Sequence, residues 1–201
     1  MLAKRTRTRQ SAFMATIWQH RGSLHAHPAA GVGIARAIDV DVQVSAGVLA
    51  LIYTIALTEA AVSIPAAAQP VRTDGLWQTT CCEVFIKGPD TAYFEFNLSP
   101  SGQWAAYRFF NYREGMEDAP IVARPEIAFL AEAGRLVLSA QIDLGFLPTE
   151  FVTSDWQLGL SCVVEGADGS KAYWALNHPP EKPDFHHDDC FALLVGAAER
   201  A

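Results

Sequence analysis

Hydrophobic and polar residues alternate along much of this chain, most densely between residues 76 and 116. Three segments there, Trp77–Lys87, Tyr93–Leu98 and Gln103–Phe110, follow a period of two, and Gly-Pro-Asp and Ser-Pro-Ser-Gly separate them. A period of two is typical of strands, because successive side chains point to opposite faces of a sheet. Gly, Pro, Asp and Ser favour turns. The pattern therefore predicts a β-meander.

Similar alternation predicts strands on both sides of the meander. They are Gly31–Val44, Val48–Leu57, Ala61–Ala68, Glu126–Ala131, Arg135–Ile142, Trp156–Glu165, Lys171–Asn177 and Cys190–Val195. A helical turn is expected only at residues 145–151, and no long stretch has the helical period of 3.6. We predict an all-β fold, an antiparallel β-sandwich of the jelly-roll kind with little helix.

The two faces of the predicted meander differ in chemistry. The apolar face carries Cys82, Val84, Ile86, Phe94, Phe96, Leu98, Ala105, Tyr107 and Phe109. The other face carries Trp77, Glu83, Phe85, Tyr93, Glu95, Asn97, Trp104 and Arg108. With a four-residue loop at Ser99–Gly102, Asn97 lies opposite Trp104, and Glu95 lies diagonal to Arg108. Carboxylates, an amide, a guanidinium and indoles on one face indicate a polar ligand.

Glu83 and Glu95 can face each other from neighbouring strands. Opposed like charges destabilise a sheet unless a cation or a ligand neutralises them, and Arg108 or Arg113 could do so. Three interpretations stay open at this point: a structural carboxylate–guanidinium network, a binding site built from the same groups, and glycoside hydrolysis by the two carboxyl groups.

Two other features are candidates for a ligand site. Trp77, Trp104 and Trp174 offer indole rings for stacking on a sugar, although a single indole is more often part of a core. The proline-rich segment from His178 to Asp189, HPPEKPDFHHDD, predicts a rigid loop. Its histidines and aspartates could bind a metal ion, the loop could wall a pocket, or it could be purely structural.

The charge of the chain is unevenly distributed. Of its 15 Lys and Arg residues, five lie in residues 1–30, which contain no acid, and 10 remain against 22 Asp and Glu. We expect residues 1–30 to be a basic tail, disordered or part of an over-extended start, with a nucleic-acid-binding arm as the alternative. Residues 31–201 are expected to form a single acidic domain, which would repel nucleic acid.

Cysteine spacing and hydropathy restrict the class of protein further. Cys81, Cys82, Cys162 and Cys190 match no zinc, thioredoxin or haem-attachment motif, so buried reduced thiols and no resident cofactor are expected. The apolar window Ala46–Ile64 alternates, which favours a strand over a membrane helix. With no convincing secretory signal, we expect a cytoplasmic protein that associates with neither membranes nor nucleic acid.

Three long motifs carry a resemblance to a known family. They are LWQTTCCEVFI, YFEFNLSPSGQWAAYRFFNYREGM and YWALNHPPEKPDFHHDDCF. In these the chain resembles, from about Val32 to Val195, bacterial DOMON-like proteins related to family 9 carbohydrate-binding modules. The resemblance implies a β-sandwich that binds a ligand, with sugar or haem as the ligand in the wider superfamily.

The resemblance also implies a set of site residues. Matching positions are Trp77, Glu83, Asn97, Trp104, Tyr107, Arg113, His178, Lys182, Asp184 and His186. Cys82 stands where Phe is more usual, a difference that concerns local packing. Haem-binding relatives use a Met with a His or Lys, and Met116 is the Met of this region. We predict a non-catalytic module that binds a carbohydrate or a sugar-containing small molecule, with hydrolysis by Glu83 and Glu95, haem binding and a metal ion as alternatives.

Overall fold

The regular secondary structure of the described residues is nearly all antiparallel strand, as the alternation predicts. The computed structural model describes residues 17–29, 33–59 and 61–200. Its strands are β1 Trp18–Ala26, β2 Ala35–Ser45, β3 Val48–Leu57, β4 Cys81–Lys87, β5 Tyr93–Leu98, β6 Trp104–Phe109, β7 Glu117–Asp118, β8 Glu126–Glu132, β9 Arg135–Asp143, β10 Trp156–Glu165, β11 Lys171–Ala175 and β12 Leu193–Val195. Helical segments are α1 Thr149–Thr153 and three 3-10 turns, Leu76–Gln78, Asp188–Cys190 and Ala197–Glu199.

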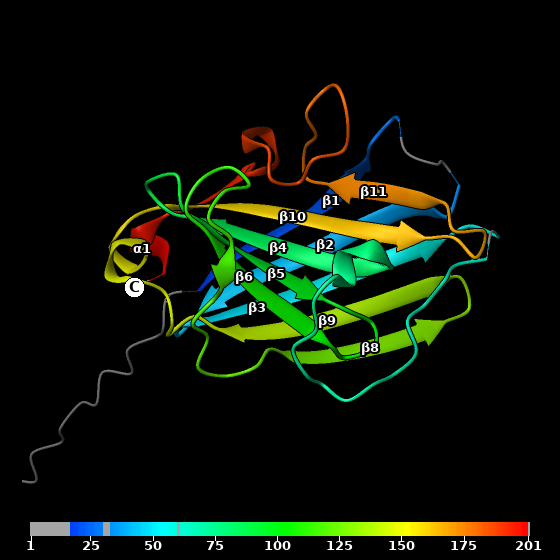
Figure 1. Cartoon of the computed structure of the whole chain (residues 1–201), viewed down its shortest axis with the longest axis horizontal. Helices are drawn as coiled ribbons and strands as arrows, with labels where there is room; N and C mark the ends of the chain where they lie inside the picture. The colour runs from blue at the N-terminus through cyan, green and yellow to red at the C-terminus, as the bar shows by residue number, and fades with distance from the viewer. Residues whose placement is uncertain (1–16, 30–32, 60, 201) are drawn as a thin grey trace, which may run out of the picture.

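The strands form one sheet that curls into two layers. Its order is β7-β6-β5-β4-β10-β11-β1-β2-β3-β9-β8, with β12 paired to β10. Strand β1 joins the layers, because most of it pairs with β2 while His25 and Ala26 pair with β11. Figure 1 shows β4, β5, β6 and β10 in front of β2 and β3. We call the sheet segment β7-β6-β5-β4-β10-β11 the front layer and the segment β1-β2-β3-β9-β8 the back layer.

The main hydrophobic core lies between the two layers. Strand β2 shows why: Ile38, Val40, Val42 and Val44 are buried, while the residues between them are exposed or half-buried. The front layer contributes inward side chains in the same way, among them Val84, Ile86, Phe94 and Phe96. The layers are also joined by a hydrogen bond, in which the Tyr53 hydroxyl of β3 donates to the backbone carbonyl of Glu83 over 2.6 Å.

Several predicted boundaries match and others do not. Val48–Leu57, Tyr93–Leu98 and Trp156–Glu165 are strands over the predicted residues. Ala61–Ala68 is not a strand; it makes only an isolated bridge between Val62 and Gly166. The first meander strand begins at Cys81 rather than at Trp77, because Gly75, at φ 77°, turns the chain into a 3-10 turn that contains Trp77.

The prediction of a tail through residue 30 is wrong for residues 18–26, which form β1. The basic charges before it lie in residues 1–16, outside the described part of the chain. Trp18 and Leu24 of β1 are buried in the core. Among the described residues, no helix has the length and apolar character needed to cross a membrane.

Candidate functional site

The outer face of the front layer carries the two predicted carboxyl groups. In the β4–β5 pair Glu83 lies opposite Asn97, and Phe85 lies opposite Glu95. The two glutamates therefore share one face, as predicted, but they are diagonal neighbours rather than directly opposed, while Val84 and Ile86 point into the core. Both are buried, at 2% exposure for Glu83 and 5% for Glu95.

The predicted pairing register of β6 with β5 is wrong by one residue. Leu98 pairs with Trp104, and Phe94 pairs with Arg108, so the register places these β6 residues on the inner side. Trp104 belongs to the main core at 9% exposure, and Arg108 stacks over the Phe110 ring, 4.6 Å from its centroid. A one-residue slip flips every side chain of a strand. Neither Trp104 nor Arg108 therefore joins Glu95 and Asn97 on the outer face.

The same slip brings Tyr107 and Phe109 onto the outer face, where a second apolar cluster forms. Its buried members are Leu76, Cys81, Phe85, Tyr93, Ala105, Tyr107, Phe109, Val163, Ala175, Phe185 and Phe191. Tyr93 stacks on Phe109 with ring centroids 4.8 Å apart. The outer face is thus partly a small second core, covered by the segment His178–Phe191, and partly an open site.

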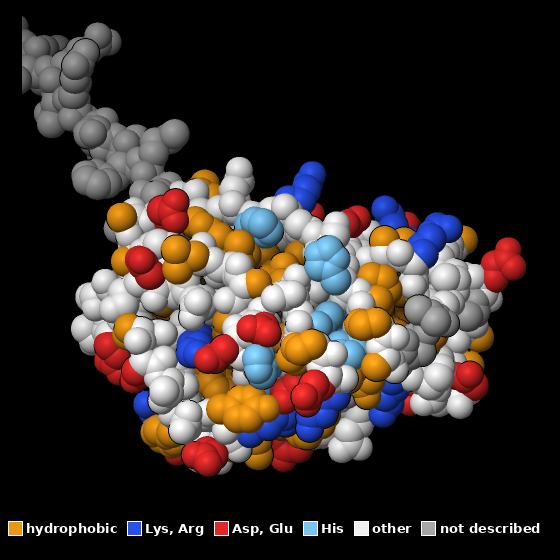
Figure 2. Space-filling model, turned by 90° about the horizontal axis from the view of Figure 1, so that it is seen from above, with side chains coloured by type: hydrophobic (Ala, Val, Ile, Leu, Met, Phe, Trp, Pro, Cys, Tyr) orange, Lys and Arg blue, Asp and Glu red, His pale blue; other side chains and the backbone are white. Residues whose placement is uncertain are grey.

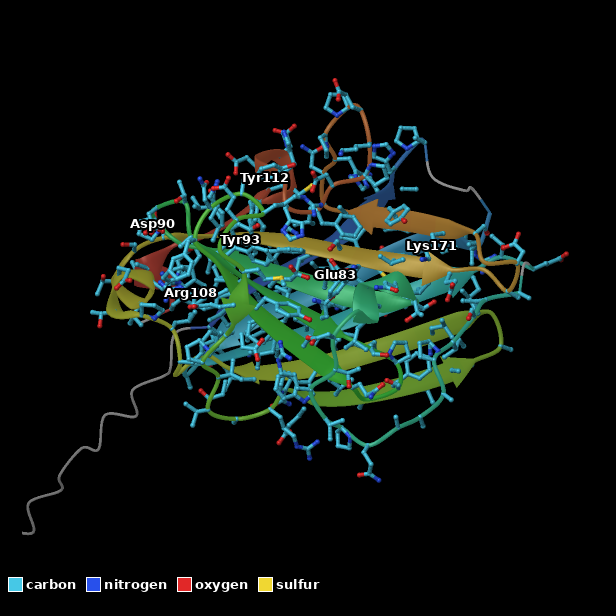
Figure 3. The ribbon with its side chains drawn as sticks, in the orientation of Figure 1. Glu83, Asp90, Tyr93, Arg108, Tyr112 and Lys171 are labelled. Carbon is cyan, nitrogen blue, oxygen red and sulfur yellow. The ribbon has the colours of Figure 1, made fainter. Side chains whose placement is uncertain are left out.

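A charged clamp holds that covering segment to the sheet. Arg113 donates through Nε and Nη2 to Asp184 Oδ1, at 3.2 and 2.7 Å, and the Tyr112 hydroxyl donates to Oδ2 at 2.5 Å. Burial alone would raise the pKa of Asp184, but these hydrogen bonds and the Arg113 charge lower it. Arg113 has a φ of 54°, so the chain turns sharply where the clamp is made. Figure 3 shows Tyr112 above the sheet that carries Glu83.

A cavity of about 450 Å³ opens between the sheet and the clamped segment. Its lining residues are Trp77, Gln78, Glu83, Glu95, Tyr107, Phe109, Arg113, Met116, Val163, Lys171, Tyr173, Pro183, Asp184, Phe185 and His186. Trp77 is 40% exposed, and its ring packs edge to face with that of Tyr107, with the ring centroids 6.0 Å apart. Figure 2, which looks down on this side of the molecule, shows histidine, acidic and hydrophobic side chains intermixed. The volume is suited to a small molecule.

Glu83 is the least satisfied polar group of the cavity. Ser161 donates its hydroxyl to Oε2 over 3.3 Å, but Oε1 is buried and has no hydrogen-bond partner among the described residues. Burial, and then the neighbouring Glu95, raise the pKa of Glu83 well above its ordinary value. A buried polar atom without a partner costs free energy, so a ligand group at Oε1 would be favoured.

Glu95 is better held. The Asn97 amide donates to its Oε1 over 2.6 Å, and Nε2 of His186 lies 3.7 Å from its Oε2. Burial raises the pKa of Glu95 to about 7. Burial, and then the Arg113 charge, lower the pKa of His186 to about 4. The backbone N–H of Arg113 donates to the Tyr93 hydroxyl, which lies 2.8 Å from His186 Nδ1.

The remaining predicted site residues lie outside the cavity lining. Trp174 is buried in the main core. His178 bonds through Nε2 to the His25 carbonyl at 2.8 Å, and burial lowers its pKa. Lys182 lines a separate depression of about 350 Å³ beside Pro179 and His187. These three residues are not brought together with Glu83.

Several lining residues were not singled out as site residues by the sequence. Tyr173, next to Trp174 on β11, takes the outward position that the alternation of that strand allows. Phe185 and Val163 are apolar residues that read as core. Cys81 points to this face but has a pKa raised by burial, which argues against a nucleophilic thiolate. No group of three or more His, Cys, Asp or Glu among the described residues is arranged to hold a metal ion.

Comparisons with known proteins find similar solved structures. A scan against protein-family models gives no match, and neither does a search of curated proteins. A candidate carbohydrate-binding protein from Bacteroides uniformis superposes with a TM-score of 0.55 at 14% identity, over 85% of this chain and 83% of that one. This match shows that the two proteins share the fold.

Two further solved structures are more distant. A family 9 carbohydrate-binding module from Caldicellulosiruptor kristjanssonii in complex with cellotriose has a TM-score of 0.47 and 11% identity, over 79% of this chain and 73% of that one. A structure of a family 9 module from the same organism in complex with glucose has a TM-score of 0.40 and 12% identity, over 77% of this chain and 74% of that one.

Proposed function

We propose that this protein is a non-catalytic carbohydrate-binding module whose ligand occupies the cavity on the outer face of the front layer. One observation carries the proposal: the half-exposed indole of Trp77 shares a small cavity with the buried, unpartnered Oε1 of Glu83. Sugar recognition combines an aromatic platform with a few fixed polar groups. The fold shared with a candidate carbohydrate-binding protein supports the same role.

The geometry favours binding over hydrolysis. Glycoside hydrolysis uses two carboxyl groups that flank the scissile bond. Here Glu95 accepts a hydrogen bond from the Asn97 amide and lies 3.7 Å from His186, and the one buried carboxyl oxygen without a hydrogen-bond partner among the described residues is Oε1 of Glu83. We expect no release of reducing sugar when the protein is incubated with glycosides.

Thermal-shift screening with isothermal titration calorimetry tests the proposal. The screen uses monosaccharides and short glycans, including glucose and cellotriose, and at least one of them should raise the melting temperature. A ligand at about 100 times its Kd adds about 2.7 kcal/mol to the free energy of unfolding. Trp77→Ala should weaken that binding strongly. Phe110→Ala removes another exposed aromatic side chain that does not line the cavity, and it should bind as the parent does.

Two results would count against the proposal. The first is a complete screen without any shift. The second is a ligand that binds Trp77→Ala and the parent equally well, which would place the binding site elsewhere.

A further inference from the structure

The cavity has an imbalance of charge. Glu83 and Glu95 are two buried carboxyl groups on adjacent strands, and neither makes an ion pair with a Lys or Arg in the described part of the chain. The Arg113 guanidinium is engaged by Asp184. Bringing two like charges together in a buried position is unfavourable unless a cation accompanies them.

The other groups around the pair do not supply that cation. Lys171 lines the cavity, but its register partner is Glu165. Lys171 is the first residue of β11, and Figure 3 labels it to the right of Glu83. His186 faces Glu95 but has a lowered pKa and is neutral near pH 7. Ser161 and Asn97 contribute hydrogen bonds without charge.

The walls of the cavity are suited to a cation with an organic body. Trp77, Tyr107, Phe109, Tyr173 and Phe185 line it, and the face of an aromatic ring attracts a cationic group. No described cluster has the ligands for a metal ion. Aromatic rings around buried carboxyl groups match an ammonium group better than a bare ion.

We propose that the ligand is an amino sugar whose ammonium group donates to Oε1 of Glu83, with Glu95 as the second negative charge. This inference rests on the proposed carbohydrate-binding function and specifies its ligand class. The sugar ring would lie against Trp77, and the ammonium group would satisfy the one buried carboxyl oxygen that has no hydrogen-bond partner among the described residues.

Binding of an ammonium group should change the protonation state of Glu83 and Glu95. Without ligand, burial and the repulsion between the two carboxyl groups favour the protonated form of the pair. The Arg113 charge in the clamp opposes this effect, and Ser161 and His186 are the other groups that face the pair. An ammonium ligand favours the ionised form, so binding near pH 7 should release protons. A neutral sugar can hydrogen-bond to the protonated pair and should release none.

Isothermal titration calorimetry with glucosamine, N-acetylglucosamine and glucose at pH 6.5 tests the inference. Phosphate and HEPES buffers, which differ in ionisation enthalpy, measure proton release. We expect glucosamine to bind roughly 10- to 100-fold more tightly than either neutral sugar, the range of a charge-assisted hydrogen bond, and to release protons.

The isosteric variant Glu83→Gln should lose that preference, while Glu126→Gln, an exposed carboxyl on β8, should keep it. Neutral sugars that bind as tightly as glucosamine, without proton release, would overturn the amino-sugar inference and leave the proposed function standing. An absence of binding by all three sugars and by the wider glycan screen would overturn both.

Discussion

Glu95 and His186 lie 3.7 Å apart, Oε2 to Nε2, and their pKa values move in opposite directions on folding. Burial raises the pKa of Glu95 from 4.5 to about 7, so between these values the folded protein binds the proton more strongly and stability falls as pH rises. Burial lowers the pKa of His186 from 6.5 to about 4, so stability rises over that window. The two effects overlap and oppose each other.

Glu95→Gln should therefore expose the contribution of His186. As the pH rises from about 4 to about 8, the unfolding free energy of this variant should increase relative to that of the parent by on the order of 3 kcal/mol. The variant lacks the raised pKa of Glu95, and a shift of one pKa unit corresponds to about 1.4 kcal/mol. Urea unfolding followed by circular dichroism at stepped pH measures it. Glu126→Gln is the exposed control and should track the parent, and a Glu95→Gln curve parallel to the parent would refute the assignment.

The indoles of Trp77 and Trp104 should respond differently to removal. Trp104 is in the main core at 9% exposure, so Trp104→Ala should cost roughly 3–5 kcal/mol of unfolding free energy. Trp77 is 40% exposed, and Trp77→Ala should cost about 1 kcal/mol or less. Denaturant unfolding of both variants checks this, and equal losses would mean that Trp77 is a packing residue.

The clamp between Arg113 and Asp184 should stabilise the covering segment. Asp184→Asn is expected to cost about 1–2 kcal/mol, because a buried carboxylate loses charge-assisted hydrogen bonds from Arg113 and Tyr112. The lowered pKa of Asp184 means that this stability is present above the ordinary carboxyl range and is lost as pH falls through the folded-state value.

Asp188→Asn is the matched control for the clamp, since Asp188 pairs with Lys87 at a largely exposed position and should contribute under about 1 kcal/mol. Chemical unfolding near neutral pH compares the two variants. An equal effect would show that Asp184 acts only as a surface charge.

Strand β1 should contribute to the core despite its place near a basic segment. Leu24 is 3% exposed, and Leu24→Ala is expected to cost about 2–5 kcal/mol. Gln19→Ala, at an exposed position of the same strand, should change stability by about 0.5 kcal/mol or less. Unfolding curves of the pair test whether β1 is part of the folded domain, and a neutral Leu24→Ala would argue against it.

Alternation placed Glu83 and Glu95 on one face of the β4–β5 pair, but a three-residue Gly-Pro-Asp turn would have set them directly opposite each other. The connection spans residues 88–92, so Glu83 pairs with Asn97 instead. A shift of two residues keeps both side chains on the same face, whereas the next turn shifts the register by one residue. Ser99 bonds to Gln103 across the loop, so Leu98 rather than Asn97 faces Trp104. Alternation alone does not set the register, since both faces of β6 carry aromatic residues.

The other differences between the predicted and the observed site concern contacts and elements that local sequence does not specify. Nothing local in the His178–Asp189 segment specifies that Asp184 accepts from Arg113, about seventy positions earlier in the chain. The sequence pattern did not predict strand β1, because most of its exposed positions are polar or basic and only Trp18 and Leu24 are large apolar residues. Trp77 lines the cavity from a 3-10 turn rather than from the predicted strand.

A structure of the protein with a bound sugar would show whether the ligand occupies the cavity beside Trp77 and Glu83. After the glycan screen has identified a ligand, co-crystallisation should place its ring against Trp77 and one of its polar atoms about 2.7–3.2 Å from Oε1 of Glu83. A sugar bound instead on the outer face of the back layer, in the groove beside Arg21 and Asp39, would contradict the account.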